Sequence, residues 1–311
     1  MSPLVSSLSI NQINNHLANS TGITFEIGPF WVNAHSKIPS LGEHLKLLYG
    51  DYPIINEGFA DFHVSLKQPK GLRRWINPQV NFFFDDETPF KPLPFAQTYP
   101  FFEWGLNWCI ATMAHQYLIV HSAIVAKGEH ALILPGKPGA GKSTLCAALI
   151  NRGWGLLSDE MALIEPETNI ATPIPRPVSL KNESIEIIRT FAPETTFGPI
   201  IEDTHKGTVT HIKPPENSVR NKSEKARIKW IVFPQFEPQS KLEVSKINNA
   251  RALIQIAGET FNYGMLGLKG FKTLKNIISN SNIMSFRYSN LNEAIEWFDK
   301  LPNHPDVREP T

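Results

Sequence analysis

The stretch Gly136-Lys137-Pro138-Gly139-Ala140-Gly141-Lys142-Ser143 decides what the rest of the chain is expected to form. It matches G-x-x-x-x-G-K-[ST], the P-loop motif. The run 131–134 before it is apolar, as in a buried strand, and apolar residues recur at helical spacing over 145–150 after it. Strand, glycine-rich loop and helix therefore follow one another in the order that the motif requires.

The physical chemistry of this loop predicts a nucleoside triphosphate with magnesium. Glycines let successive backbone N–H groups point at one phosphate, and the helix dipole adds positive potential there. Lys142 is expected to reach the β- and γ-phosphates, Ser143 to ligate Mg²⁺ and Thr144 to support the α-phosphate. The alternative is a glycine-rich turn that happens to hold a lysine. The predicted ATP-binding residues are Gly136, Lys137, Pro138, Gly139, Ala140, Gly141, Lys142, Ser143 and Thr144.

Composition narrows the class of protein. The chain has 311 residues, 41% of them hydrophobic, which is enough for a substantial core. A formal net charge of +1 gives no global electrostatic argument for nucleic acid or an acidic membrane. Cys109 and Cys146 lie in apolar helical patterns, as buried thiols of a reducing compartment do. With no signal-peptide pattern and no apolar run of membrane-spanning length, a cytoplasmic protein is expected.

The patterning divides the chain into three parts. Residues 1–98 are expected to form a small N-terminal α+β module, 99–300 the catalytic domain and 301–311 a frayed tail. A proline-rich segment at 89–94 crosses from the first part to the second. The expected elements are strands over 24–33, 60–66, 118–126 and 131–134, and helices over 41–49, 99–116 and 142–150.

Acidic residues end the strand that follows the P-loop helix, in Gly155-Leu156-Leu157-Ser158-Asp159-Glu160. Carboxylates at this place suit magnesium binding and abstraction of a proton from an attacking hydroxyl. The alternative is a strand-end turn with solvated acids. His121 lies on the strand before the loop; a lone histidine in an apolar run is more often a core residue, but if the two strands are neighbours it lies near Asp159.

Basic residues follow in two further segments. The proline-stiffened stretch 173–183 presents Arg176 and Lys181, cations of the kind that phosphoryl transfer needs, although an ordinary surface loop is equally compatible. The polar loop 203–209 also carries a lysine, and there the ordinary loop is the favoured interpretation. The local patch Lys67, Lys70, Arg73, Arg74 and Trp75 is expected to be a solvated rim or a docking edge rather than an RNA site.

Taken together, these segments resemble the catalytic domain of bacterial HPr kinase/phosphorylase, whose fold is akin to that of phosphoenolpyruvate carboxykinase. More closely, the chain resembles the HprK-related kinase A family over nearly its whole length. Besides the P-loop and the acidic strand, the motifs that carry the resemblance are 58–64, 89–94, 103–108, 176–185, 261–263 and 286–289. The resemblance implies an α/β fold, a P-loop kinase core of the HPr kinase/PEP carboxykinase type with a small N-terminal α+β module.

The resemblance also implies roles for individual residues. Asp159 matches the acid that acts as base toward the acceptor hydroxyl, Glu160 stands in the place of a metal-side aspartate, and His121 matches the histidine of the preceding strand. The glutamate-isoleucine-arginine-glycine metal segment of HPr kinase is absent, and Arg176 and Lys181 occupy that region. The predicted catalytic residues are Asp159, His121, Lys142, Arg176 and Lys181, and the predicted metal ligands are Ser143 and Glu160.

The expected activity is therefore ATP-dependent transfer of the γ-phosphate to a serine-like hydroxyl of a peptide or small protein, in a peptide-modification pathway. The resemblance implies PqqD-like and nucleotidyltransferase-like partner proteins and a homo-oligomer. A kinase for a small metabolite and a non-catalytic ATP-binding switch or scaffold stay open as alternatives. No base-reading motif separates ATP from GTP, and the phosphate acceptor is not named by the sequence.

Overall fold

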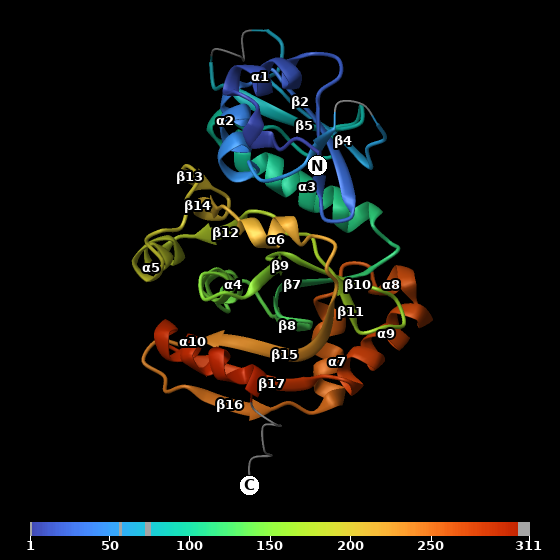
Figure 1. Ribbon diagram of the computed structural model, residues 1–311, viewed down its shortest axis with the longest axis vertical. Coiled ribbons are helices and arrows are strands. Elements are labelled where there is room, and N and C mark those ends of the chain that lie inside the picture. Colours follow the sequence, from blue (N-terminus) through green and yellow to red (C-terminus); the bar gives the residue numbers. More distant parts are fainter. Residues whose placement is uncertain (1, 56–57, 72–75, 304–311) are drawn as a thin grey trace.

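The computed structural model describes residues 2–55, 58–71 and 76–303. Arg73, Arg74 and Trp75 of the predicted basic patch, and residues 304–311 of the predicted tail, lie outside the described residues. Two sheets with their helices form the N-terminal and P-loop parts of the molecule, and a third, smaller sheet lies beside them (Figure 1). The architecture is mixed α/β, as predicted.

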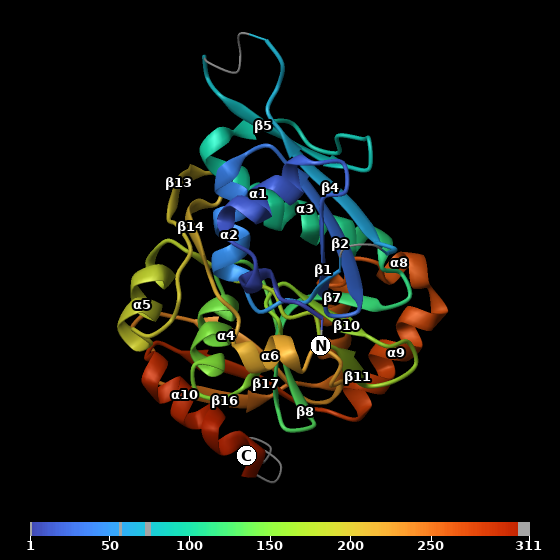
Figure 2. The same ribbon diagram turned by 45° about the horizontal axis from the view of Figure 1, so that its top comes forward.

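The N-terminal module is built on one six-stranded sheet of order β3-β1-β2-β4-β5-β6. The stretch 24–33, predicted as one strand, is instead a hairpin, because Gly28 takes a left-handed φ of 56° and turns the chain back. In the turned view β4 and β5 extend away from the P-loop sheet (Figure 2). The elements are α1 (Ile10–Ala18), β1 (Ile23–Ile27), β2 (Phe30–Ser36), α2 (Pro39–Leu48), β3 (Ile54–Ile55), β4 (Phe62–Lys67), β5 (Gln79–Phe84) and β6 (Leu93–Pro94).

Helix α3 (Thr98–Met113) lies between this module and the P-loop sheet (Figure 1). Its aromatic residues pack on the N-terminal sheet: Phe101 and Phe82 have ring centroids 5.8 Å apart, and Gly105 leaves room for the Phe82 ring. The helix therefore packs into the hydrophobic core of the N-terminal module, although it lies after the domain boundary that was predicted at residue 98. Glu103 and Asn107, on another face of α3, hydrogen-bond to Arg176 in the segment before β12.

The P-loop sheet has the order β11-β10-β7-β8-β15-β17-β16, with β9 also paired to β7. Strands β8, β15 and β17 are parallel, whereas β7 and β8 form the antiparallel hairpin that leads into the P-loop. The strands are β7 (Leu118–Lys127), β8 (His130–Pro135), β9 (Gly155–Ser158), β10 (Met161–Ile164), β11 (Ile170–Thr172), β15 (Ala226–Phe236), β16 (Glu243–Lys246) and β17 (Asn282–Tyr288).

Two apolar clusters pack against this sheet. One holds buried residues of α4 and α10 together with β12 and α5, and the other holds buried residues of α7 and α9. Cys109 and Cys146 are buried free thiols. Within the described residues, no helix combines the length and the hydropathy needed to cross a bilayer. The helices are α4 (Lys142–Ile150), α5 (Glu183–Phe191), α7 (Asn249–Gly258), α8 (Tyr263–Leu266), α9 (Leu268–Ser279) and α10 (Leu291–Lys300).

A three-stranded sheet of order β12-β14-β13 adjoins α4 on one side and the N-terminal module on the other. Lys213, just after β14, pairs with Asp51 at 2.7 Å, and Lys222, after α6, pairs with Glu26 at 3.3 Å. These ion pairs join the segments that follow the third sheet to the N-terminal module. Its elements are β12 (Val178–Lys181), β13 (Ile201–Thr204) and β14 (Gly207–Ile212), followed by α6 (Glu216–Arg220).

Candidate active site

The glycine-rich loop joins β8 to α4 and rests on the ends of two parallel strands. Gly136, Gly139 and Gly141 have φ of 143°, 85° and 93°. A Cβ on Gly141 would lie 2.2 Å from the Tyr288 hydroxyl oxygen, and the Phe236 N–H donates to the Ala140 carbonyl at 3.3 Å. The loop is thus held by the carboxyl ends of β15 and β17, with a backbone that only glycine adopts easily.

Lys142 opens helix α4, and its ammonium folds back over the loop. Only 8% of the residue is exposed, and Nζ donates to the carbonyls of Gly136 and, at 3.3 Å, Lys137. Burial lowers the pKa of Lys142, while the charges of Glu259, Glu160 and Asp159 oppose that shift. The lysine therefore lies between the predicted phosphate site and a group of carboxylates.

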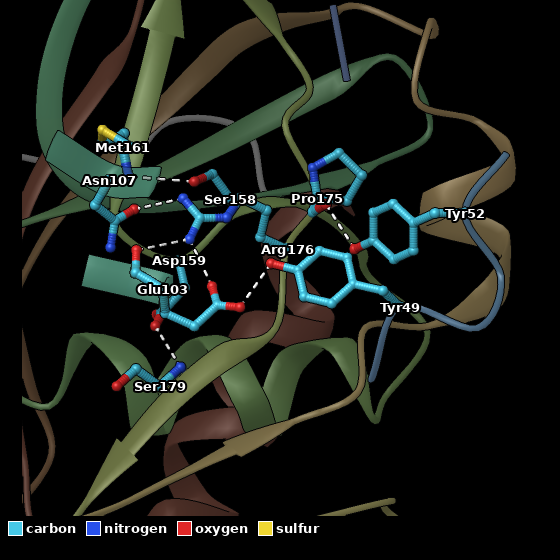
Figure 3. A network of polar contacts seen from close by, with 10 residues as sticks. All are labelled: Tyr49, Tyr52, Glu103, Asn107, Ser158, Asp159, Met161, Pro175, Arg176 and Ser179. Atoms are coloured by element: carbon cyan, nitrogen blue, oxygen red, sulfur yellow. Dashed lines mark hydrogen bonds and ion pairs between the residues drawn. The ribbon is translucent and has the colours of Figure 1, made fainter. Parts of the chain in front are cut away.

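Asp159 follows β9 directly and is almost completely buried. Its Oδ2 accepts a hydrogen bond from the Ser179 N–H at 3.1 Å (Figure 3). Among the described residues, Oδ1 is buried and has no hydrogen-bond partner. Burial, and then the charge of Glu160, raises the pKa of Asp159 to about 7, while the Ser179 N–H, the nearby Ser143 side chain and the charge of Lys181 act in the opposite direction. One oxygen fixes the carboxylate while the other faces the site unpaired.

His121 lies beside Glu160 rather than beside Asp159, where the sequence placed it. Strands β7 and β10 pair with His121 opposite Met161, and this register brings Nδ1 to 3.8 Å from Glu160 Oε2. Burial lowers the pKa of His121 and the Glu160 charge only partly offsets that shift. At 3.8 Å the neutral imidazole packs beside the half-buried carboxylate without a hydrogen bond, so it is suited to limiting the positions of Glu160 rather than to abstracting a proton itself.

Arg176 is held by two residues of helix α3, Glu103 and Asn107. Nη2 pairs with Glu103 Oε2 at 2.5 Å, Nη1 donates to Asn107 Oδ1 at 2.7 Å, and the other Glu103 oxygen accepts from the Tyr49 hydroxyl at 2.7 Å (Figure 3). Arg176 and Glu103 are both buried. The geometry favours a role for Arg176 in joining α3 to the segment before β12, over the predicted contact with the transferred phosphate.

Lys181 ends β12 and stands near the acids, since its positive charge acts to lower the pKa of Asp159 and of Lys142. The sequence did not single out Trp104 on α3, Glu259 after α7 or His211 on β14 as site residues. Trp104 lies in the segment 103–108 that carries the resemblance, but the resemblance gave it no role, and the other two lie outside the motifs. Trp104 and His211 line one cleft with Asp159, Glu160 and Arg176. Burial lowers the pKa of His211 to about 4, so this imidazole is neutral.

The residues present fit a magnesium ion. Within the described part of the chain, no group of three or more His, Cys, Asp or Glu side chains forms a protein-only metal cage. Mg²⁺ is commonly bound through one or two carboxylates together with substrate phosphates, and needs no such cage. The Glu160 carboxylate and the Ser143 hydroxyl, both close enough to influence the pKa of Asp159, supply suitable hard oxygen donors.

Comparison with known proteins adds little to what the geometry of the site says about function. No family model matches the sequence, and no curated protein matches it. Among solved structures, the chain is similar to the Hpr(Ser) kinase/phosphatase from Coxiella burnetii, at 13% identity and a TM-score of 0.27, over 60% of this chain and 97% of that one. A likeness at that TM-score carries no argument, so the function is argued from the site itself.

Proposed function

We propose that this protein is an ATP-dependent kinase with a P-loop core of the HPr kinase/PEP carboxykinase type, which phosphorylates a serine-like hydroxyl of a peptide or small protein. One observation carries the proposal: a buried carboxylate, Asp159, keeps an unpartnered oxygen beside the helix that the glycine-rich loop opens. An unpartnered buried oxygen is costly to the fold, which favours a chemical role.

On the donor side, the loop and Lys142 hold the triphosphate. The backbone N–H groups from Gly136 to Thr144 and the positive end of α4 would bind the β- and γ-phosphates. Lys142 would exchange the carbonyls of Gly136 and Lys137 for phosphate oxygens. Mg²⁺, held through Ser143 and Glu160, would neutralise charge on the phosphates.

On the acceptor side, Asp159 acts as general base. Oδ1 accepts the proton of the acceptor hydroxyl as its oxygen attacks the γ-phosphorus; a new P–O bond forms, and the bond to the β-phosphate oxygen breaks and releases ADP. The Ser179 N–H keeps Oδ2 in place, so the proton goes to Oδ1. Lys181 offsets the negative charge near the transferred group, and His121 limits the positions of Glu160.

The acceptor class and the cellular setting belong to the same proposal. The resemblance of the sequence to HprK-related kinase A supports a peptide or small protein acceptor, PqqD-like and nucleotidyltransferase-like partners, a homo-oligomer and a cytoplasmic location. The buried cleft floor and the N-terminal wall provided by α3 are compatible with a hydroxyl presented on a chain segment.

The proposal is tested with γ-labelled ATP and Mg²⁺. Wild type and Lys142→Ala are purified with their co-purifying proteins, incubated with the label and analysed by gel and mass spectrometry. Label in a peptide or small protein with wild type, and none with Lys142→Ala, is expected. Label in a small metabolite contradicts the acceptor class, and ATP binding without transfer to any acceptor contradicts catalysis.

A further inference from the structure

The tip of the β13–β14 hairpin is a rigid turn that presents His205 and Lys206. The Thr204 hydroxyl donates to the Gly207 carbonyl at 2.6 Å and accepts from the Lys206 N–H at 3.0 Å. From the N-terminal side, Gln97 Nε2 donates to the Asp203 carbonyl at 3.0 Å. The turn is therefore held from within and by the residue that precedes α3, so its side chains have a defined place.

Lys206 is a partly buried cation without a carboxylate partner in the described part of the chain. Its ammonium lies 5.0 Å from the centroid of the Trp104 ring, and the His205 ring meets the same indole edge-on at 4.6 Å. Burial, and then the positive charge of Lys181, lowers the pKa of Lys206. A lysine held on an indole beside a second lysine is arranged to receive an anion.

This arrangement stands at the rim of the cleft that contains the proposed base. Trp104 lines the cleft together with Asp159 and Glu160. Lys142 hydrogen-bonds within the glycine-rich loop. The positive charge of Lys181 lowers the pKa of both Lys142 and Lys206. Lys206 thus stands beside α3 at Trp104, and both Lys181 and the Glu160 carboxylate are close enough for their charges to act on it.

We propose that Trp104 and Lys206 form an acceptor subsite that binds the carboxylate of an acidic residue close to the phosphorylated hydroxyl of a peptide. The proposal rests on the proposed kinase function and specifies its acceptor. One ammonium on an aromatic face fits a single carboxylate on an apolar stem: the indole contacts the stem and the ammonium pairs with the charge. Helix α3, which packs on the N-terminal sheet, contributes Trp104, and the β13–β14 hairpin contributes Lys206, so the subsite needs both segments in place.

The test is binding of synthetic heptapeptides to the full-length protein with Mg²⁺ and ADP. Each peptide carries one central serine and one aspartate at position −2, −1, +1 or +2, and each has an asparagine counterpart. Binding is followed by NMR through the indole N–H of Trp104, assigned with Trp104→Phe. At least one aspartate peptide is expected to shift this resonance and to bind about tenfold more tightly than its asparagine counterpart.

Lys206→Gln is expected to remove that preference, and Lys206→Arg to keep it. Lys229→Gln is the matched control, because Lys229 lies 5.1 Å from the Trp230 ring, outside the cleft. The inference is overturned if no aspartate peptide is preferred, if Lys206→Gln keeps the preference, or if Lys206→Gln instead weakens ATP relative to ADP, which would assign Lys206 to the γ-phosphate.

The two proposals fail in different ways. If an aspartate peptide binds as expected but no serine receives phosphate from Mg·ATP, the kinase proposal fails and the anion subsite stands. If wild type and Lys206→Gln phosphorylate aspartate and asparagine peptides with the same relative efficiencies, the subsite fails and the kinase proposal stands.

Discussion

Two buried carboxylates, Glu103 and Asp159, line the same cleft, and they differ in how many of their oxygens have hydrogen-bond partners. Both oxygens of Glu103 are paired, with Arg176 and with the Tyr49 hydroxyl. Asp159 has one oxygen held by the Ser179 N–H and the other buried without a partner among the described residues. A buried carboxylate with both oxygens paired fixes how two parts of a fold meet, whereas a buried carboxylate with an unpaired oxygen lowers stability and is retained where chemistry needs it. The comparison favours a structural role for Glu103 and supports the catalytic role that we propose for Asp159.

The largest expected effect separates the two acids by activity. Asp159→Asn should lower the rate of phosphate transfer by about 10²- to 10⁴-fold, the usual contribution of a general base, with ATP affinity little changed. Glu103→Gln, assayed at a temperature where it is folded, should keep most of the activity. Single-turnover transfer from γ-labelled ATP measures both, and equal losses in the two variants would contradict the assignment.

The second prediction tests the structural role of Glu103 through the stability of its variants. Glu103→Leu leaves the Arg176 guanidinium buried and unpaired, which should lower the free energy of unfolding by about 3–5 kcal/mol. The double variant Glu103→Leu/Arg176→Met should recover much of that loss, because neither charge is then left alone. Urea denaturation of the two variants and wild type gives the values. A double variant as unstable as the single one would mean that the ion pair is not the cause.

A smaller effect is expected at the glycine-rich loop, which we propose binds ATP. Gly141→Ala places a Cβ in a left-handed backbone and against the Tyr288 hydroxyl, which should weaken ATP binding about tenfold. Gly128→Ala is the matched control: its φ is 58°, it lies in the β7–β8 turn, and a Cβ there meets no atom within 4 Å. Titration calorimetry with ATP compares them, and similar ATP affinities would show that the loop backbone does not set the affinity.

The sequence predicted the local parts of this site well. The strand–loop–helix order around Lys142 and the acid after the next strand follow from patterns within about 30 residues, and the structure has these elements where they were expected. The strand predicted over 24–33 was wrong because the turn at Gly28 interrupts it.

Long-range pairings could not be read from such patterns. Arg176 is separated by 73 residues from Glu103, and nothing near either residue marks them as partners. His121 faces Glu160 because of the β7–β10 register, which the sequence does not specify. Lys206 was expected in an ordinary polar loop, and its place became visible only when the third sheet brought that hairpin against Trp104.

The most direct test of the central claim is the pH dependence of unfolding for ligand-free wild type and Asp159→Asn in EDTA. The folded-state pKa of about 7 lies above the value of about 3.9 for an unfolded chain, so the folded protein binds this proton more tightly. Wild type should therefore lose stability as pH rises from about 4 to 7, with the full cost present above that range.

Asp159→Asn has no carboxyl group to ionise, so its free energy of unfolding does not include this loss of stability. Its free energy of unfolding relative to wild type should rise by about 2 kcal/mol between pH 5 and pH 8, although the variant transfers no phosphate. An Asp159→Asn protein that is more stable than wild type at pH 8 and inactive is the predicted result. A variant that is less stable than wild type at pH 8 would show that Asp159 holds the fold together as Glu103 does, and would contradict the account.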